Sequence, residues 1–255
     1  MSESRTSRPV AAEQIVGGRE VQEDALDVRC VPGGDGREAW LLVLADGMGG
    51  HAGGAAASRL AVDTFVDACI GGISDIPSAL QAGLDRANRR IADEISARPA
   101  FGDMGTTLVG VVISNSHLYW ISVGDSPLWL YRDGQLQRLN ADHSMVPVLE
   151  GLVEIGRMSE QEAAVDPRRN QLRSAVSGGE FPLVDFCPGP QALRAGDLVV
   201  LASDGVETLS QAQLAAILGD GGRSLQQRVR SVMDAIEAAG RPRQDNASLI
   251  VLEVS

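Results

Sequence analysis

Acidic residues recur at the ends of apolar, strand-like runs in this sequence. Asp46 and Asp204 each end such a run and precede glycine, and Asp125 follows another run within Gly124-Asp125-Ser126. Other acidic residues stand where such runs begin: Glu23, Asp24 and Asp245. Taken singly, aspartate before glycine is typical of a turn, because its side chain bonds its own backbone and glycine tolerates positive φ. Several such positions in one domain favour a second interpretation, since the strand ends of a layered sheet structure meet at a common rim.

Carboxylates gathered at one rim need compensating positive charge, because like charges at close range raise one another's pKa or attract cations. The chain offers little of its own: its 22 basic residues are all arginine, and its three histidines are His51, His117 and His143. Oxygen ligands favour hard divalent ions, so we predict a Mg²⁺ or Mn²⁺ site. The glycine after Asp46 leaves the Gly47 carbonyl open as a further ligand. From the residues alone, simple turns and a metal site both remain open.

The composition of the 255-residue chain excludes several classes of protein. Walker-type phosphate loops, kinases and Schiff-base enzymes need a lysine, and the sequence contains none. The net charge of −12 disfavours binding to nucleic acid and to anionic lipid. The three cysteines, Cys30, Cys69 and Cys187, lie far from one another and from the histidines, which argues against a zinc site or a disulfide framework. Because no signal peptide or membrane-spanning run is visible, we expect a cytoplasmic protein that does not insert in membranes.

Strand-length apolar runs and helical repeats follow one another in blocks. Strands are predicted at residues 39–45, 107–113, 118–123, 128–131, 198–202 and 247–254, several of them joined by hairpin-type turns. Helices are predicted at residues 54–68, 76–95 and 225–239 from apolar residues spaced three or four apart. Gly49, Gly50, Gly53 and Gly54 lack the lysine and the spacing of a phosphate-binding loop, and we interpret them as a flexible connection into the first helix.

These blocks indicate an α+β layered domain rather than a doubly wound sheet. The polar residues 1–9 are predicted to be disordered, and residues 10–255 to form a single domain. Residues 145–172 carry short helical pieces without a long periodic face, and we interpret them as a small excursion from the core.

Short motifs occur in a fixed order along the chain: Arg19-x-x-Gln22-Glu23-Asp24, Ala45-Asp46-Gly47-Met48-Gly49-Gly50-His51, Met104-Gly105-Thr106-Thr107-Leu108, Val123-Gly124-Asp125-Ser126, Asp142-His143-Ser144, Ser203-Asp204-Gly205 and Gln244-Asp245-Asn246. Each alone is weak, but together they resemble the metal-dependent protein phosphatases, type 2C, in their bacterial form. The resemblance extends from about Gln14 to the C-terminus. It implies a central β-sandwich of two antiparallel sheets flanked by pairs of α-helices, with the metal site in a cleft at one end and residues 145–172 as a flap subdomain.

The resemblance also implies a set of metal ligands. Asp46 resembles the carboxylate that bridges two ions, and Gly47 the residue whose carbonyl binds one of them. The remaining implied residues are Asp204 and Asp245 on the first ion, Glu23 near the second, Asp24 in the outer shell, and Asp125 on a third, weaker ion. The implied cofactors are therefore two Mn²⁺ or Mg²⁺ ions and a third ion at Asp125.

Other polar residues are assigned to substrate binding, proton transfer or support. Arg19 resembles the arginine that binds the substrate phosphate, which suits the two parallel donors of a guanidinium. His51 is a candidate general acid for the leaving alkoxide, and a hydrogen-bonded residue at a helix start is an equally good interpretation. His143 is expected to fasten its loop to the core. Ser126 and Ser203 stand beside key aspartates, but neither lies in a nucleophile elbow, so we do not expect a serine nucleophile.

The implied reaction is hydrolysis of phosphoserine and phosphothreonine by a metal-bridging hydroxide, without a phosphoenzyme. The implied partners are phosphorylated proteins, in opposition to a serine/threonine kinase, and the protein is expected to be a monomer. The alternative is a weak or inactive phosphoprotein-binding module of the same fold, against which the intact ligands argue. The sequence departs from the family pattern at three places. Gln22 replaces an asparagine, and residues 174–179 match the segment after the flap only loosely. Pro127 replaces an arginine, so one local salt bridge or hydrogen bond is expected to be missing.

Overall fold

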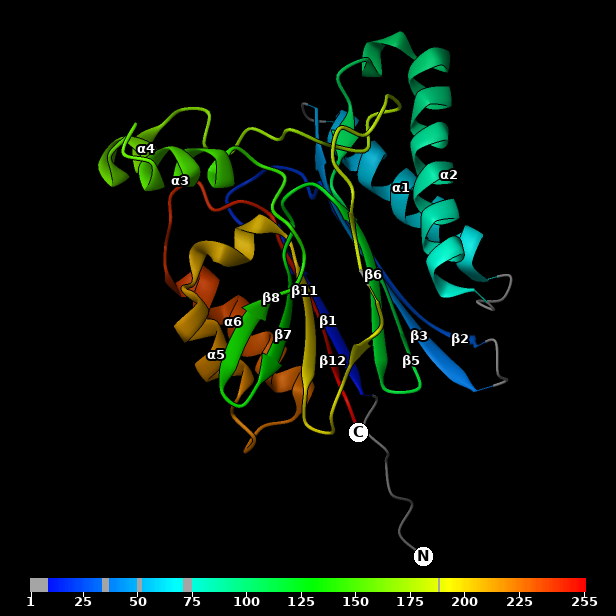
Figure 1. Ribbon diagram of the computed structural model, residues 1–255, viewed down its shortest axis with the longest axis vertical. Coiled ribbons are helices and arrows are strands. Elements are labelled where there is room, and N and C mark those ends of the chain that lie inside the picture. Colours follow the sequence, from blue (N-terminus) through cyan, green and yellow to red (C-terminus); the bar gives the residue numbers. More distant parts are fainter. Residues whose placement is uncertain (1–8, 34–36, 50–51, 71–74, 188) are drawn as a thin grey trace, which may run out of the picture.

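The computed structural model describes residues 9–33, 37–49, 52–70, 75–187 and 189–255. In this part of the chain two antiparallel sheets pack face to face, with a pair of helices on the outer side of each (Figure 1). The sandwich that the resemblance implies is therefore confirmed. The predicted disorder of residues 1–9 falls almost entirely outside the described residues.

The first sheet has the strand order β1–β12–β11–β7–β8, and all its neighbours are antiparallel. Its strands are β1 (Val10–Ile15), β7 (Leu128–Arg132), β8 (Gln135–Arg138), β11 (Leu198–Ala202) and β12 (Ala247–Glu253). Its outer face is covered by α5 (Gln211–Leu218) and α6 (Leu225–Ala238). Ser210 and Ser224 begin these helices with capping boxes, which satisfy backbone N–H groups that the first turn leaves free.

The second sheet has the order β10–β6–β5–β3–β2, with two short strands attached beside β3 and β6. Its strands are β2 (Asp24–Pro32), β3 (Glu38–Met48), β4 (Gly105–Thr106), β5 (Leu108–Ser114), β6 (His117–Val123), β9 (Asp185–Phe186) and β10 (Gln191–Ala192). Its outer face is covered by α1 (Ala52–Ile70) and α2 (Ile76–Ala97). The described residues also include two short 3₁₀ helices, at Pro99–Phe101 and at Asp204–Thr208.

The apolar residues form three layers, one between the sheets and one under each helix pair. Strand β3 contributes to two of these layers, because successive side chains of a strand point to opposite faces. Leu41 and Val43 pack with Phe65 of α1, whereas Leu42 and Leu44 pack against the first sheet. Burial on both faces explains why the strand has an uninterrupted apolar run instead of alternating polar residues.

Strand β3 continues past the point at which the sequence predicts it to stop. The apolar run ends at Ala45, but the strand includes Asp46 and Gly47 and ends at Met48. The extension is stabilised by β4, which pairs Gly47 with Thr106 and Met48 with Gly105. Asp46 is therefore held in the sheet and does not form the turn that the Asp-Gly pair alone favours.

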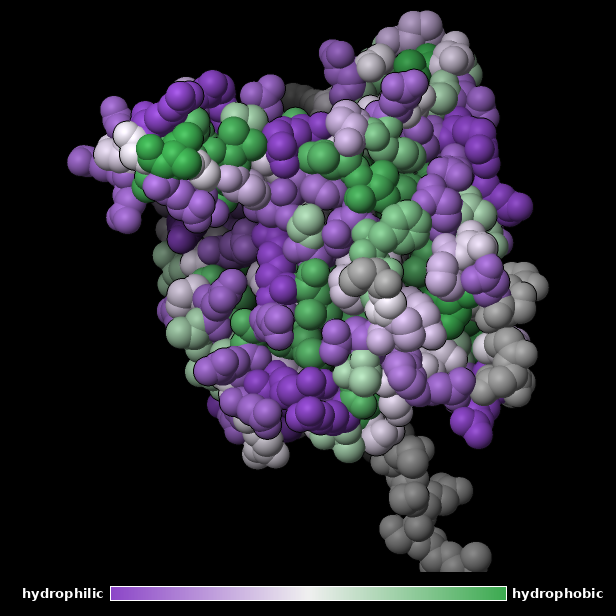
Figure 2. All heavy atoms as spheres, viewed as in Figure 1, coloured by the Kyte–Doolittle hydropathy of each residue, from purple (hydrophilic) through white to green (hydrophobic). Residues whose placement is uncertain are grey.

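Residues 145–172 form α3 (Val146–Glu154) and α4 (Glu160–Val165), which project from one end of the sandwich (Figure 1). Figure 2 shows apolar residues gathered on this projection. Ile155 and Val165 are 65% and 76% exposed there. In the described ranges no helix combines the length and the apolar character needed to cross a membrane.

Candidate metal centre

A cleft of about 660 Å³ lies at the end of β3 and collects most of the predicted site residues. Its lining includes Arg19, Glu23, Asp46, Gly47, Asp125, Asp204 and Asp245. Asn170 and Leu172 also line it, so the chain that follows α4 borders the cleft. Asp24 is buried and stands directly opposite Asp46 in the β2–β3 pair. His51, the candidate general acid, lies outside the described residues.

Two threonines fix the backbone of Asp46. The Thr107 hydroxyl accepts the Asp46 N–H at 2.9 Å. The Asp46 carbonyl in turn accepts the Thr107 N–H and the Thr106 hydroxyl, each at 2.9 Å. Both polar groups of the Asp46 backbone are thereby satisfied by protein, which leaves the carboxylate as the group that faces the cleft.

The first turn of α1 approaches Gly47 so closely that only glycine fits at position 47. A Cβ on Gly47 would lie 2.2 Å from the Gly54 carbonyl oxygen and 2.6 Å from that of Glu23. A Cβ on Gly54 would lie 2.5 Å from Glu23 Oε1. For Gly53 and Gly54 the interpretation as a flexible connection is therefore wrong, because both lie inside α1. At Gly54 the lack of a side chain permits the close approach to Glu23. Gly50 lies outside the described residues.

Asp24 connects the two sheets beneath the cleft. Its Oδ2 accepts hydrogen bonds from the hydroxyls of Ser203 at 2.8 Å and Ser248 at 2.5 Å, which belong to the β11 and β12 side of the sandwich. Its Oδ1 is buried without a hydrogen-bond partner, as is Oε1 of Glu23. A buried acceptor without a partner is costly, so both oxygens fit direct or water-mediated contact with a cation.

Asn246 ties the N-terminal segment to the last strand, a role that the sequence reasoning missed. Its Oδ1 accepts the Glu23 N–H at 2.7 Å, and its Nδ2 donates to the carbonyls of Val16 and Val21. The neighbouring Asp245 accepts a hydrogen bond from Arg19 Nη2 at 2.6 Å. The Gln244-Asp245-Asn246 motif contains a signal for this role. The side-chain amide of Asn246 stands next to the predicted ligand Asp245, and such an amide can hold another segment of the chain by hydrogen bonds to its backbone.

The loop between β6 and β7 carries Asp125 into the cleft. Its Gly124 N–H donates to His143 Nδ1 at 3.2 Å, and the His143 N–H donates to the Gly124 carbonyl at 3.1 Å. His143 is buried, and burial lowers the pKa of its imidazole. These contacts agree with the interpretation of His143 as a residue that fastens its loop to the core.

Three carboxylates of the cleft, those of Asp46, Asp204 and Asp125, hold protons more tightly than isolated carboxylates. Burial, followed by the charges of Asp24 and Asp204, raises the pKa of Asp46 well above its ordinary value. Burial and the charge of Asp125 raise the pKa of Asp204 to about 7. Burial and the charge of Asp142 raise the pKa of Asp125 to about 6. Arg19 is the single cationic side chain among the described residues of the lining, so the site has an excess of negative charge.

A comparison with protein families decides where the chain belongs. The family model described as protein phosphatase 2C matches residues 18–249. The chain is a member of the protein phosphatase 2C family. The family resemblance that the ordered motifs indicate is confirmed.

Named relatives and solved structures agree with this membership. The serine/threonine protein phosphatase PstP of Mycobacterium tuberculosis is 36% identical over 171 residues, which cover 66% of this chain and 32% of PstP. The chain thus spans about a third of the length of that relative. A putative protein phosphatase 2C-type of Streptococcus pyogenes is 34% identical over 184 residues, which cover 70% of this chain and 72% of the relative.

Among solved structures, the serine/threonine phosphatase of S. agalactiae has a TM-score of 0.83 and 26% identity, and the match covers 96% of this chain and 99% of that one. The catalytic domain of PstP in complex with two manganese ions has a TM-score of 0.76 and 28% identity, with 96% of each chain covered. These likenesses span both sheets and both helix pairs of the type 2C fold.

The donors of the cleft suit hard cations, although the side chains have not converged around one. Among the described residues, no three His, Cys, Asp or Glu side chains form a ready-made metal site. Asp245 is paired with Arg19, and Asp24 with two serines. The cleft nevertheless offers oxygen donors, an excess of negative charge and the unpartnered Glu23 Oε1, which is the chemistry that Mg²⁺ and Mn²⁺ prefer.

The raised pKa values predict that the metal-free protein loses stability as pH rises from about 4 to about 7. An unfolded aspartate has a pKa near 3.8, whereas the folded values are about 7 for Asp204 and about 6 for Asp125. Between these limits the unfolded chain binds fewer protons, so the free energy of unfolding decreases with pH. Thermal unfolding in chelator at several pH values measures this slope. Asp204→Asn should flatten it, and a slope that is the same in both proteins would contradict the prediction.

Proposed function

We propose that this chain is a metal-dependent protein serine/threonine phosphatase. The observation that carries the proposal is the cleft, in which carboxylates from distant segments of both halves of the sandwich accumulate with one arginine. Family membership supports it, as do relatives that are named serine/threonine phosphatases. We further propose phosphoserine and phosphothreonine of other proteins as substrates, a cytoplasmic location and a monomeric state, in opposition to a serine/threonine kinase.

Two Mn²⁺ or Mg²⁺ ions are the proposed cofactors, and the PstP complex with two manganese ions supports this choice. The proposed ligands are Asp46, the Gly47 carbonyl, Asp204, Asp245 and Glu23, with Asp125 on a third ion and Asp24 in support. Such ions, when bound, lower the pKa of water enough to supply a nucleophile at neutral pH. The unpartnered oxygens of Glu23 and Asp24 support this assignment.

The residues of the chain provide binding, positioning and exclusion of competing nucleophiles. Arg19 is the proposed phosphate-binding residue: it is half-exposed at the rim, and the planar fork of donors of a guanidinium suits phosphoryl oxygens. Ser126 and Ser203 are fully buried and engaged, the first with the Thr107 hydroxyl and the second with Asp24. Neither serine is accessible to a phosphoryl group, so no phosphoenzyme is expected. His51 remains a candidate general acid.

Metal removal tests this function directly. We expect the purified chain to release phosphate from phosphoserine and phosphothreonine peptides in Mn²⁺, to lose that activity in a strong chelator, and to regain it when excess Mn²⁺ is restored. Phosphate release is measured with the metal-free protein as the starting point. Full turnover in chelator would overturn the metal requirement. Tight phosphopeptide binding without turnover in Mn²⁺ would favour the alternative, an inactive phosphoprotein-binding module.

A further inference from the structure

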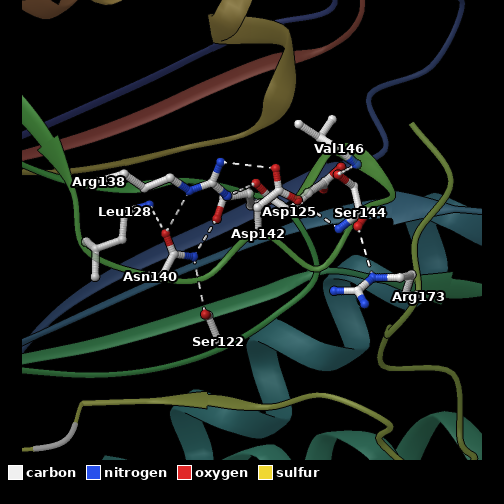
Figure 3. A network of polar contacts seen from close by, with 10 residues as sticks. Ser122, Asp125, Leu128, Arg138, Asn140, Asp142, Ser144, Val146 and Arg173 are labelled. Atoms are coloured by element: carbon white, nitrogen blue, oxygen red, sulfur yellow. Dashed lines mark hydrogen bonds and ion pairs between the residues drawn. The ribbon is translucent and has the colours of Figure 1, made fainter. Parts of the chain in front are cut away.

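The β7–β8 hairpin brings an arginine beneath the loop that carries Asp125. Arg138, the last residue of β8, donates from Nη2 to the Asp125 carbonyl at 2.6 Å (Figure 3). Its Nη1 lies 3.5 Å from Asp142 Oδ2, and its Nε donates to Asn140 Oδ1 at 3.4 Å. The Arg138 side chain is 23% exposed, so this guanidinium is largely enclosed by its acceptors. One side chain thus connects the main chain of Asp125 with both Asn140 and Asp142.

Asn140, which follows Arg138 closely in the chain, bonds further backbone groups of the Asp125 loop. Asn140 is buried and accepts the Leu128 N–H at 2.8 Å, while its Nδ2 donates to the Ser126 carbonyl at 3.0 Å. The Asp142 carboxylate accepts the Ser144 N–H at 2.7 Å, close to the start of α3. Figure 3 shows these contacts as one continuous network around Asp125. Asn140 therefore holds the loop after Asp125, and Arg138 bonds Asp125 itself.

Residue 127 is a proline, so the loop has no arginine of its own next to Asp125 and Ser126, and Arg138 reaches it from another strand. Family resemblance leads us to expect an arginine after Gly124-Asp125-Ser126, but this chain has Pro127, which has no side-chain donor. The sequence therefore predicts a missing salt bridge or hydrogen bond. In the structure Arg138, from the neighbouring strand β8, bonds the loop and pairs with Asp142.

We propose that Arg138 is a positioning residue for Asp125, acting through its bond to the Asp125 carbonyl and its contacts with Asn140 and Asp142. It fixes the Asp125 main chain so that the carboxylate faces the cleft, and it does not touch the substrate. The inference rests on the proposed function, because the placement of Asp125 matters to that function through the third metal ion. A planar guanidinium is suited to this role, since it can serve a carbonyl and a carboxylate at fixed angles.

The positioning role and a purely electrostatic role predict opposite effects on metal binding. Removal of a positive charge close to a cation site strengthens cation binding, because a repulsion is lost. Removal of a residue that orients a ligand weakens metal binding, typically by 10–100-fold. The sign of the change therefore separates the two explanations.

The test compares Arg138→Gln with a control from the other end of the same hairpin, Arg132→Gln. Arg132 bonds Asp197, just before β11, at 2.5 Å and the Ala192 carbonyl, and none of its hydrogen bonds reaches the Asp125 loop. Its loss therefore removes an arginine and an ion pair from the same hairpin. Mn²⁺ binding is titrated by calorimetry and electron paramagnetic resonance, and amide exchange is followed over residues 124–128. We expect R138Q to weaken the lowest-affinity Mn²⁺ step about 10-fold and to accelerate exchange of the loop, and R132Q to do neither.

Unchanged or tighter Mn²⁺ binding in R138Q would overturn the proposal, and so would equal changes in R132Q. Should R138Q fail to fold, R138K is measured in its place. Arg138 reaches its acceptors from three separate nitrogens, whereas the donors of an ammonium all lie on one atom, so the same sign is expected with a smaller size. Neither readout requires catalysis. A wild-type chain that proves inactive on phosphopeptides would overturn the proposed function, whereas the comparison of loop exchange would still decide the role of Arg138.

Discussion

Substitution Asp46→Asn is expected to reduce phosphate release at least about 100-fold and to stabilise the metal-free protein. Loss of residues that merely support a ligand costs 10–100-fold, so loss of the proposed bridging carboxylate should exceed that range. The stability gain follows from electrostatics: burial, followed by the charges of Asp24 and Asp204, raises the pKa of Asp46, and a neutral amide avoids both the burial of a charge and the repulsion. We expect the metal-free Tm to rise by a few degrees, since about 1 kcal/mol corresponds to about 2–4 °C in a domain of this size.

The matched control for this prediction is Asp27→Asn on strand β2. Asp27 lies on the strand paired with β3, and its carboxylate bonds Arg29 at 2.8 Å instead of lining the cleft. We expect D27N to retain wild-type turnover. Phosphate release in Mn²⁺ and thermal unfolding in chelator are measured for both variants. If D46N kept more than a tenth of the wild-type rate, Asp46 would not be the bridging ligand.

The second large effect is expected at Arg19. Arg19→Ala should lower kcat/KM for phosphopeptides by about 100-fold, the usual size of the loss when one donor to a developing anionic charge is removed. It should leave Mn²⁺ binding intact or make it tighter, because Arg19 Nη2 lies 2.6 Å from Asp245 Oδ2 and occupies a proposed ligand oxygen. Steady-state kinetics and calorimetric Mn²⁺ titration measure the two effects separately.

A second variant, Arg19→Lys, separates the charge of Arg19 from the geometry of its donors. Lysine keeps the charge but presents a point charge in place of two parallel donors, so we expect an activity between those of the wild type and R19A. Arg241, an exposed arginine near the last strand, serves as the control for loss of surface charge, and R241A should retain full activity. Weaker Mn²⁺ binding in R19A, with turnover unaffected, would contradict the assignment of Arg19 to phosphate.

Local sequence patterns predict those parts of the fold that depend on near neighbours. The run 198–202 is β11 as predicted, and the helices at 76–95 and 225–239 are α2 and α6 within a residue or two. Strand β1 was missed because five of its six residues are only half-buried or exposed, so it lacks a clear apolar pattern. Helix α5 was missed because it has only eight residues, too few for a repeating apolar face.

In the candidate site, too, the sequence predicts features that depend on neighbouring residues but not contacts between distant segments. The acidic residues could be named from their positions beside apolar runs, and their roles from ordered motifs. Contacts between distant segments could not be predicted from local patterns. The Ser248 hydroxyl bonds Asp24 across 224 positions in the chain, and the Asn246 side chain bonds the Glu23 N–H across 223. Arg138 escaped notice because no motif contains it, and only the folded hairpin brings it to Asp125.

Anomalous diffraction at the manganese edge, from crystals grown with Mn²⁺, tests the central claim most directly. The claim is that oxygen atoms from distant segments gather hard cations at the end of β3. We predict anomalous peaks between Asp46, Asp204 and Asp245, with a peak also bordered by Asp46 and Glu23. Crystals saturated with Mn²⁺ in which no peak lies among these side chains would contradict the account.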